Sequence, residues 1–402
     1  MKYLRFDLLA LCLGGLAIGM AEFVPMGVLP DVARSLDITI PQAGHLISVY
    51  AVGVVTGAPL LVAIGERFPP RRVLVAFMLI FALFNGLFAV APSFPILVAA
   101  RFFAGLPHGA FFGLGAVVAS RLASPGREAS AVAVMFAGLT IANIIGVPIG
   151  TLLGHAIHWR LPFMAVAVIA LAAASAIRRS VPYLDAARGG GILDALRIFS
   201  TPRLWPVIGI SAIGTGGLYG WISYIAPLVT RVTGIAPNRV PLVMILAGLG
   251  MAVGNWFGGR VADRHSPLRA VTALLAGMVI ASVAVALFAP FEAATLVMTF
   301  VTGAIAFSII APLQMLMIET ATGSKTMASA VMQSTANVGN ALGAYLGGLG
   351  IAAGFGLTAP EYIGAALAFI GFLCGVAMLG LTHRSPAPAK ALPARPALTR
   401  SG

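Results

Sequence analysis

The chain has 402 residues, of which 59% are hydrophobic and only 9% are charged, whereas roughly a quarter of the residues in an ordinary soluble domain are charged. Its mean hydropathy is +1.00. A soluble protein of this size could not bury so much apolar surface, so a free cytosolic enzyme is excluded. The net charge of +13 would suggest a nucleic-acid partner for a soluble protein. Here the charges lie in short gaps between apolar runs, which indicates a bilayer-spanning protein that binds no nucleic acid.

Apolar runs broken by charge, proline or glycine predict twelve membrane helices, because about 20 apolar residues cross a bilayer. The predicted class is an all-α membrane protein with a six-helix bundle at 1–178 and a second one at 204–384. A cytoplasmic linker at 179–203 joins the two bundles, and the Pro- and Ala-rich tail at 385–402 is predicted to be disordered. The predicted helices cover residues 7–30, 42–64, 73–91, 95–120, 129–154, 161–178, 204–229, 240–259, 270–289, 293–318, 327–352 and 361–382.

The distribution of basic residues predicts the topology. When the N-terminus and every second loop are assigned to one side, that side holds most of the 25 lysines and arginines. The opposite side holds Arg34, Arg160, Arg231 and Arg239. The positive-inside rule therefore places both termini in the cytoplasm. An error of one helix would destroy this asymmetry, so the charges also support an even number of helices.

The sequence repeats itself at an offset of 197 residues. The hydrophilic elbow at 66–72 matches the elbow at 263–269, and 131–135 matches 328–332. The same offset takes Gly19 to Gly216. Six predicted helices separate equivalent points, so the two halves have the same orientation in the membrane. Parallel repeats of this kind are found in secondary transporters.

Glu22 is the acidic residue that lies deep inside a predicted span. An ionisable side chain at that depth is a functional candidate by default. Gly15 and Gly19 lie on the same helical face, and Pro25 frees a backbone carbonyl nearby. These features favour a carboxylate that binds protons. The alternative is a structural partner for a buried arginine.

Arg101 and His108 on the fourth predicted helix are the other candidates for proton coupling. Arg101 lies at nearly the same depth as Glu22, so the two side chains could pair or compete for a proton. The alternative for Arg101 is a guanidinium bonded only to backbone carbonyls. His108 lies two turns further along the helix and could relay protons near neutral pH. Its alternative is a neutral histidine bonded to a carbonyl.

The two elbows of the repeat each combine a carboxylate with arginines, which predicts ion pairs that close the inner face and break as the halves rock. The alternative for these arginines is topology anchoring. On the fifth predicted helix, glycines spaced by four residues predict close helix contact and sliding. The predicted gating residues are Glu66, Arg67, Arg71, Arg72, Asp263, Arg264, Arg269, Gly146, Pro148 and Gly150.

Uncharged polar and aromatic side chains at mid-membrane depth are the candidates for substrate binding. Each one alone is more often a helix-packing residue. Together they favour a neutral polar or amphipathic substrate over an ion, because a cation channel needs rings of acids. The predicted substrate-binding residues are Asn143, Tyr219, Trp221, Tyr224, Gln314, Gln333, Asn337 and Asn340.

The sequence lacks the motifs of an enzyme, a cofactor site or a metal site. The segment 323–326 lacks the glycine that precedes the lysine of a P-loop, and neither HExxH nor a Cys/His cluster with metal spacing occurs. Cys12 and Cys374 lie within apolar runs and read as small buried hydrophobes. The first apolar run lacks the cleavage site of a signal peptide. We therefore expect no cofactor and no metal. We also predict a monomer whose partners are protons, a small-molecule substrate and the bilayer.

Several short stretches carry a family likeness: GMAEF at 19–23, AGH at 43–45, PHGAFFG at 107–113, ANIIGVPIG at 142–150, SPLR at 266–269 and GAYLGG at 343–348. Together with the elbow motif and Arg101, these stretches resemble the major facilitator superfamily. Within it they resemble the arabinose-efflux-like group of drug and sugar exporters. The resemblance extends over nearly the whole chain apart from the tail. It implies the twelve-helix fold of that superfamily, a place in the bacterial inner membrane, and proton-driven export. Glu22 matches the first-helix acid of similar drug exporters.

The chain departs from the pattern of the superfamily at three places. Val62 and Pro69 in the first elbow stand where glycines are usual, and Ser266 replaces the later glycine of the second elbow. Val147 interrupts the glycine–proline pair of the usual antiporter motif, a spacing shared by the arabinose-efflux-like group.

The predicted function is proton-coupled export of a small organic solute, either a sugar, a nucleoside or an amphipathic drug, by alternating access. Protonation of Glu22 releases Arg101 or substrate, and the halves then rock around a midplane cavity. The first alternative is uptake or facilitated diffusion of a sugar or metabolite on the same fold. The second is a membrane-embedded enzyme or receptor, against which the lack of nucleophile clusters, metal clusters and a soluble signalling domain argues.

Overall fold

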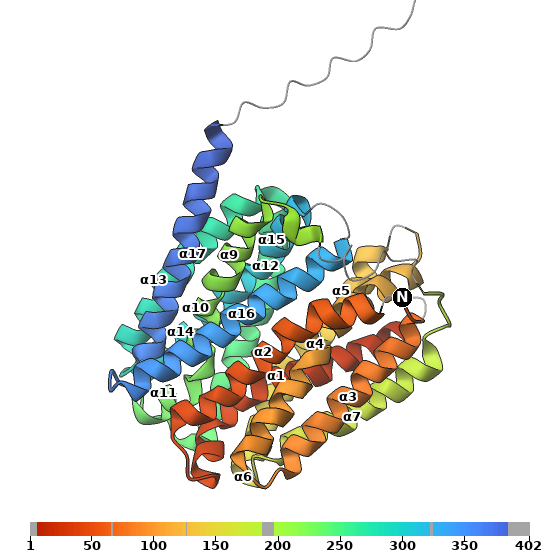
Figure 1. The fold of residues 1–402 in the computed structure, drawn as a ribbon. Helices are drawn as coiled ribbons and strands as arrows, with labels where there is room; N and C mark the ends of the chain where they lie inside the picture. Colours follow the sequence, from red (N-terminus) through yellow and green to blue (C-terminus); the bar gives the residue numbers. More distant parts are fainter. Residues whose placement is uncertain (1–5, 66, 126, 187–196, 322–324, 385–402) are drawn as a thin grey trace, which may run out of the picture.

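The computed structural model describes residues 6–65, 67–125, 127–186, 197–321 and 325–384, and within these residues it contains helices and no strand (Figure 1). Glu66, the centre of the predicted linker and the predicted tail lie outside the described residues. Long apolar segments favour helices here, because a helix satisfies its backbone hydrogen bonds internally where a bilayer offers no water.

Within the described residues, the first half consists of six helical segments, one of which is interrupted by a π-helical turn. In chain order the elements are α1 (Phe6–Ser35), α2 (Ile40–Gly65), α3 (Pro70–Val90), α4 (Phe94–Leu122), α5 (Glu128–Ile141) continued by η1 (Ala142–Gly146) and α6 (Val147–Ala156), and α7 (Leu161–Ser180).

The described part of the second half also has six helical segments, and two of them are broken. The short turn η2 (Arg197–Ser200) leads into this half. Its elements are the broken segment α9 (Leu204–Gly214), α10 (Gly216–Ser223) and α11 (Ile225–Arg231); η3 (Pro237–Arg239) with α12 (Val240–Arg264); α13 (Pro267–Phe288); α14 (Glu292–Ser308) with α15 (Ile310–Thr320); α16 (Lys325–Ala352); and α17 (Ala359–Arg384).

The predicted all-α fold with twelve helical segments in two bundles is confirmed. By length and composition, ten helical stretches in the described residues could cross a membrane. The other two predicted spans are the broken segment 204–231 and α16. The first predicted helix was expected to end at residue 30, but α1 continues to Ser35 through Pro25 and Pro30. Prolines are tolerated inside membrane helices because neighbouring groups satisfy the freed carbonyls.

Glycines produce the same close helix packing in both halves. In the first half, Gly57 of α2 lies against the carbonyl of Leu106 in α4. In the second half, Gly254 of α12 lies in the same way against the carbonyl of Ala304 in α14. A Cβ atom at either glycine would overlap the facing carbonyl oxygen. The internal repeat of the sequence is therefore also a repeat of backbone-to-backbone contacts.

The glycine stripe on the fifth segment lies inside the first half, not between the halves. Gly138, Gly146 and Gly150 all pack against α1, where Gly146 faces Met20 and Gly150 faces Val24. The equivalent stripe on α16 packs against the segment α9–α10 of the second half. These glycines therefore join the first and fifth segments of each half.

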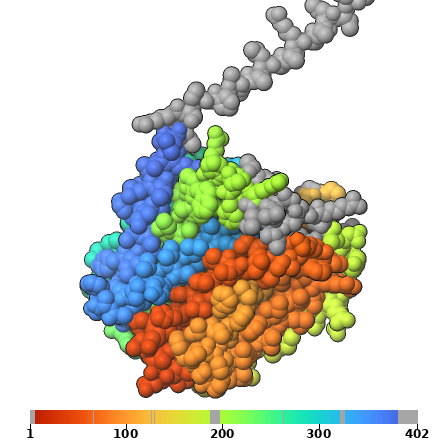
Figure 2. Space-filling view, viewed as in Figure 1, coloured from red at the N-terminus to blue at the C-terminus, as the bar shows by residue number. Residues whose placement is uncertain are grey.

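The two halves meet most extensively along α2 and α16, which lie side by side (Figure 1). The space-filling view shows the blue surface of α16 directly against the red-orange surface of α2 (Figure 2). Other contacts between the halves join α1 to α11, join α4 to α16, and join η1 and α6 to α12. We call the end of the bundles where α1 begins the inner face and the opposite end, where α1 ends and α2 begins, the outer face.

Aromatic side chains close the outer face. The Tyr224 ring of the second half lies against Gly44 at the start of α2 and against Gly348 near the end of α16. Next to it, the His45 and Tyr345 rings have centroids 5.7 Å apart. Since both halves contribute to this layer, the two bundles are held together at the outer face.

Candidate functional site

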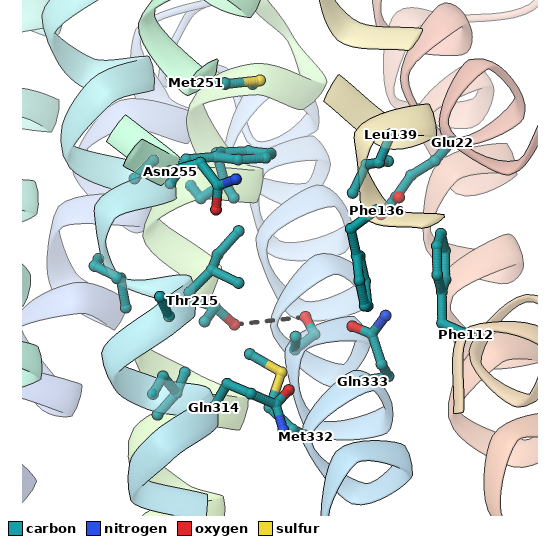
Figure 3. A pocket seen from close by; sticks show the side chains of 18 of the residues that line it. Glu22, Phe112, Phe136, Leu139, Thr215, Met251, Asn255, Gln314, Met332 and Gln333 are labelled. Atoms are coloured by element: carbon teal, nitrogen blue, oxygen red, sulfur yellow. Dashed lines mark hydrogen bonds between the residues drawn. The ribbon is translucent and has the colours of Figure 1, made fainter. Parts of the chain in front are cut away.

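A cavity of about 430 Å³ lies between the halves, within the size range of small-molecule sites in proteins. At its outer end it is lined by Glu22, Asn143 and Gly248, and toward the inner face by Val132 and Ile318. The cavity therefore extends from mid-depth toward the inner face, on the opposite side from the aromatic closure. Figure 3 shows side chains from both halves facing each other across it.

Glu22 of α1 lines the outer end of the cavity and is only 5% exposed. Its Oε1 atom accepts a hydrogen bond from the Tyr219 hydroxyl of α10 at 3.2 Å and a longer one from Asn340 Nδ2 of α16 at 3.5 Å. Among the described residues, no lysine or arginine lies within ion-pair distance of this carboxylate. Both donors come from the other half, so the carboxylate is held across the interface.

Arg101 of α4 is fully buried, and its hydrogen bonds go to backbone carbonyls. Nε donates to the Leu46 carbonyl of α2 at 3.1 Å, and Nη1 donates to the Ala21 carbonyl of α1 at 3.0 Å. The guanidinium also lies 4.1 Å from the centroid of the Tyr50 ring, close enough for a cation–π interaction. Of the two predicted arrangements, the geometry is that of a guanidinium bonded to carbonyls, which joins three helices beside Glu22.

His108 lines the cavity two helical turns from Arg101, and Tyr50 contacts both side chains. The Tyr50 hydroxyl and His108 Nδ1 are 3.0 Å apart, and both residues are buried. The predicted alternative for His108 was a bond to a carbonyl; in the structure its partner is the Tyr50 hydroxyl. Tyr50 therefore lies between two candidates for proton coupling, a position that the sequence did not predict.

Five of the eight predicted substrate-binding residues line the cavity, and three do not. The three outside it are Trp221, Tyr224 and Asn340, all buried in helix packing. The Tyr224 hydroxyl donates to the Ala344 carbonyl at 2.7 Å within the second half. The residues that line the cavity are Asn143, Tyr219, Gln314, Gln333 and Asn337.

The sequence analysis missed the aromatic part of the cavity wall. Phe112 of α4 and Phe136 of α5 stack with ring centroids 4.9 Å apart and planes 8° from parallel. Opposite them lie Met251, Asn255 and Met332 from the second half (Figure 3). In a chain with 23 phenylalanines and 15 methionines, residue type alone does not distinguish a cavity wall from a lipid-facing surface.

The π-helical turn η1 brings Asn143 to the interface. The Val147 N–H bonds the Ala142 carbonyl five residues back, and Pro148 has no N–H to donate. The Asn143 carbonyl therefore lacks both of its usual helical donors, and it lies directly against Gly248 of α12. The inserted valine of the antiporter-like motif thus coincides with a distortion that joins the halves at the outer end of the cavity.

The elbow residues lie at the inner face, away from the cavity. Arg71 Nη1 donates to the Val181 carbonyl at 3.3 Å and so connects the start of α3 to the end of α7. Glu66 lies outside the described residues, and the side chain of Asp263 does too, so the predicted pairs of these acids stay predictions. The remaining elbow arginines are exposed, namely Arg67, Arg72, Arg264 and Arg269.

The described lining of the cavity contains one acid, Glu22, and no lysine or arginine. The described residues also hold no cluster of three side chains that could bind a metal. A second buried acid, Glu361 at the start of α17, is 1% exposed but lies outside the cavity. The site combines one carboxylate, one histidine, several amides and an aromatic wall, which suits binding of an uncharged or cationic organic molecule better than binding of an anion.

Comparisons with known proteins agree with this architecture. A sequence profile of the Major Facilitator Superfamily matches residues 11–330 and 227–401. The "Putative transporter AraJ" of Escherichia coli (strain K12) is 35% identical over 367 residues, which cover 91% of this chain and 92% of that protein. The "Inner membrane transport protein YdhP" of the same organism is 38% identical, with 92% and 95% covered. A "Chloramphenicol resistance protein" of Streptomyces lividans is 34% identical, with 81% and 84% covered.

Solved structures show the same fold at low sequence identity. A bacterial homologue of the human lysosomal transporter Spinster, in an inward-facing and unoccupied conformation, superposes with a TM-score of 0.69 at 16% identity and covers 94% of this chain and 98% of its own. The human organic anion transporter MFSD10 gives the same TM-score at 17% identity, with 93% and 100% covered. The chain is a multi-pass membrane transporter for a small molecule, not an enzyme, and it belongs to the Major Facilitator Superfamily.

Proposed function

We propose that the protein is a proton-coupled exporter in which Glu22 carries the proton. The observation that carries this proposal is the buried carboxylate at the outer end of the cavity, bonded to the opposite half. A carboxylate at mid-membrane depth without an ion-pair partner is costly and is typical of a proton site. His108, Tyr50 and Arg101 lie in the adjoining network and are proposed to hold the local charge distribution in place.

The proposed substrate is a neutral or cationic amphipathic molecule with an aromatic portion. The stacked Phe112 and Phe136 provide a flat apolar wall, and Gln314, Gln333 and Asn337 provide hydrogen-bonding groups on the opposite side. Glu22 adds a negative charge that favours a cation and disfavours an anion. The name of the Streptomyces relative as a chloramphenicol resistance protein supports export of such a compound.

The proposed direction follows from the predicted topology. We place both termini in the cytoplasm and the two bundles at 1–178 and 204–384. The inner face is then the cytoplasmic face, and the cavity of this conformation opens toward it. A solute would enter from the inner side, and the halves would then rock to open the outer face. An inward proton gradient can drive this cycle, because a membrane potential contributes about 2.3 kcal/mol per charge per 100 mV.

Transport into inverted membrane vesicles tests this function. Ethidium and chloramphenicol serve as cationic and neutral aromatic probes, with arabinose and uridine as the sugar and nucleoside. Export predicts that acidifying the vesicle interior drives accumulation of an aromatic probe. Glu22→Gln abolishes this accumulation but keeps exchange of labelled for unlabelled probe, because a neutral side chain cannot exchange protons.

Glu361→Gln is the matched control, since it removes a second buried carboxylate that does not line the cavity. This variant is expected to accumulate the probe like the wild type. Gradient-driven accumulation that survives Glu22→Gln would contradict the assignment of the proton site. Equilibration of arabinose alone across the vesicle membrane, without dependence on the pH gradient, would instead favour facilitated diffusion of a sugar on the same fold.

A further inference from the structure

The hydrogen bond between Glu22 and Tyr219 joins equivalent positions of the two halves. The residues are 197 apart in sequence, which is the offset of the internal repeat that takes Gly19 to Gly216. Asn340, the second donor to the carboxylate, is related by the same offset to Asn143. At this repeated position the first half thus contributes a carboxylate, Glu22, and the second half a hydroxyl donor, Tyr219. The two side chains meet between the bundles.

This contact lies between the cavity and the closed outer face. Glu22 and Tyr219 line the outer end of the cavity, whereas Asn340 is fully buried behind it. Beyond them lies the aromatic layer around Tyr224. Opening the outer face requires α1 to move away from α10 and α16, so it must break both hydrogen bonds to Glu22.

We propose that Tyr219 and Asn340 are positioning residues that form a latch with the Glu22 carboxylate, and that this latch keeps the empty, unprotonated protein closed at its outer face. The inference rests on the proposed role of Glu22 in proton coupling. A charged carboxylate accepts hydrogen bonds about twice as strong as a neutral acceptor does. Protonation of Glu22 therefore weakens both bonds and releases the halves.

The strength of the latch depends on the charge of Glu22, because no neighbouring group in the described residues neutralises this carboxylate through an ion pair. Arg101 from α4 approaches α1 through the Ala21 carbonyl, His108 from the same helix lines the cavity, and Tyr50 from α2 lies between those two. From the second half, Tyr219 is the titratable group that faces the carboxylate, beside the neutral Asn340. None of these groups forms an ion pair with Glu22 in the described residues.

A latch of this kind explains how proton and substrate movements are kept together. The unprotonated empty protein stays inward-facing, because its outer face is held by both hydrogen bonds. A bound substrate that contacts Tyr219 in the cavity competes for the hydroxyl and so opens the latch, as protonation does. Without the latch, the empty unprotonated protein would reorient freely, and protons would cross the membrane with no substrate moving in return.

A proton-leak assay tests the latch without any substrate. Purified protein is reconstituted in liposomes that contain a pH-sensitive dye, the potential is clamped with potassium and valinomycin, and a pH gradient is imposed. The wild type dissipates the gradient slowly. Tyr219→Phe removes one bond of the latch and is expected to dissipate it about tenfold faster, which corresponds to about 1.4 kcal/mol off the barrier.

The double variant Glu22→Gln/Tyr219→Phe restores the slow rate, since no carboxylate remains to carry the proton. Tyr362→Phe, which removes an exposed hydroxyl on α17, keeps the wild-type rate. Asn340→Leu removes the other bond and also accelerates the leak, so it replaces Tyr219→Phe if that variant does not fold. A leak that does not accelerate in the folded variants, or that persists in the double variant, overturns the latch.

The same series separates the latch from the underlying function. If Glu22→Gln keeps gradient-driven accumulation of the probe in vesicles, then the proposed proton site fails whatever the leak assay gives. If Glu22→Gln abolishes accumulation and Tyr219→Phe still shows no leak, the proton site stands and only the latch fails.

Discussion

The two halves share a backbone scaffold but differ in where they carry charge. Gly53 of α2 faces the Phe102 carbonyl, and Gly250 of α12 faces the Phe300 carbonyl in the same manner. Phe102 and Phe300 are therefore equivalent in the packing, and the residues that precede them, Arg101 and Thr299, are equivalent too. Arg101 donates to carbonyls of two other helices, whereas the Thr299 hydroxyl bonds only the Thr295 carbonyl in its own helix at 2.8 Å. At equivalent positions, Arg101 therefore joins neighbouring helices in the first half, whereas Thr299 forms a hydrogen bond only within its own helix in the second half.

The same difference is seen at the cavity. The first half contributes the carboxylate of Glu22 and the imidazole of His108, and the second half contributes the amides of Asn255, Gln314 and Gln333. Duplicated scaffolds free one copy to specialise, since the helix packing is maintained by glycines that both copies keep. We infer that the first half provides the titratable groups and the second half most of the neutral hydrogen-bonding groups.

Replacing Arg101 should cause the largest loss of stability, and it tests the difference between the two halves most directly. Arg101→Leu removes the donors to the Leu46 and Ala21 carbonyls. Each buried acceptor left without a donor costs about 1–3 kcal/mol, so thermal unfolding in detergent should show a loss of about 3 kcal/mol. Thr299→Val at the equivalent position should cost less than about 1 kcal/mol, because the threonine bond is local to its helix.

Arg101→Lys sharpens the same test. A lysine keeps the charge but lacks the planar fork that reaches two carbonyls at once, so it should recover only part of the lost stability. Full recovery by lysine would show that charge, and not the joining of three helices, is the role of Arg101. Equal losses in Arg101→Leu and Thr299→Val would contradict the difference between the halves.

Apolar runs and charge predicted the helical segments well, because a membrane helix is recognisable by its length and composition. The same signals carried no information about how a helix is broken. The interruptions at Thr215 and Tyr224 and the π-turn at 142–146 lie within segments that the sequence predicts as single helices. The offset of 197 pointed to Gly19 and Gly216 but gave no reason to expect that Glu22 and Tyr219, three residues further on, touch each other.

The sequence predicted the part of the candidate site that uses a residue type rare in membrane helices, an acid, but not the part that uses common residue types such as aromatic residues. A single deep acid is conspicuous in this sequence, and Glu22 does line the cavity. Tyr224 was expected to bind substrate because it is aromatic and at suitable depth, but it fills the space beside Gly44 and Gly348 at the outer closure. Which face of a helix meets the cavity depends on the packing of all twelve segments, which one sequence does not specify.

The glycine contacts should give effects of intermediate size that are equal in the two halves. Gly57→Ala and Gly254→Ala each place a Cβ against a backbone carbonyl that cannot rotate away, and such overpacking costs about 1–3 kcal/mol. Gly259→Ala is the control, since nothing lies within 4 Å of its added Cβ. Thermal unfolding of the three variants measures the loss of stability in each half and in the control. A loss in only one of the first two would mean that the scaffold is not shared equally.

The arginines at the outer face should show the smallest effects and again differ between the halves. In the first half, Arg160 Nη1 donates to the Ala89 and Ala91 carbonyls at 3.1 and 2.7 Å, which satisfies the end of α3. In the second half, Arg239 forms an ion pair with Glu292 at 2.7 Å, with both side chains nearly half exposed. Arg160→Ala should cost about 1–2 kcal/mol, whereas Arg239→Ala should cost at most about 0.5 kcal/mol.

Salt separates the two arginines further. An exposed ion pair is screened by ions, while hydrogen bonds to buried carbonyls are not. Raising the salt concentration from about 0.01 to 1 M shortens the Debye length roughly tenfold, and the small effect of Arg239→Ala should then vanish while that of Arg160→Ala persists. A salt-insensitive loss of more than about 1 kcal/mol in Arg239→Ala would show that the second half also uses an arginine to join its outer helix ends.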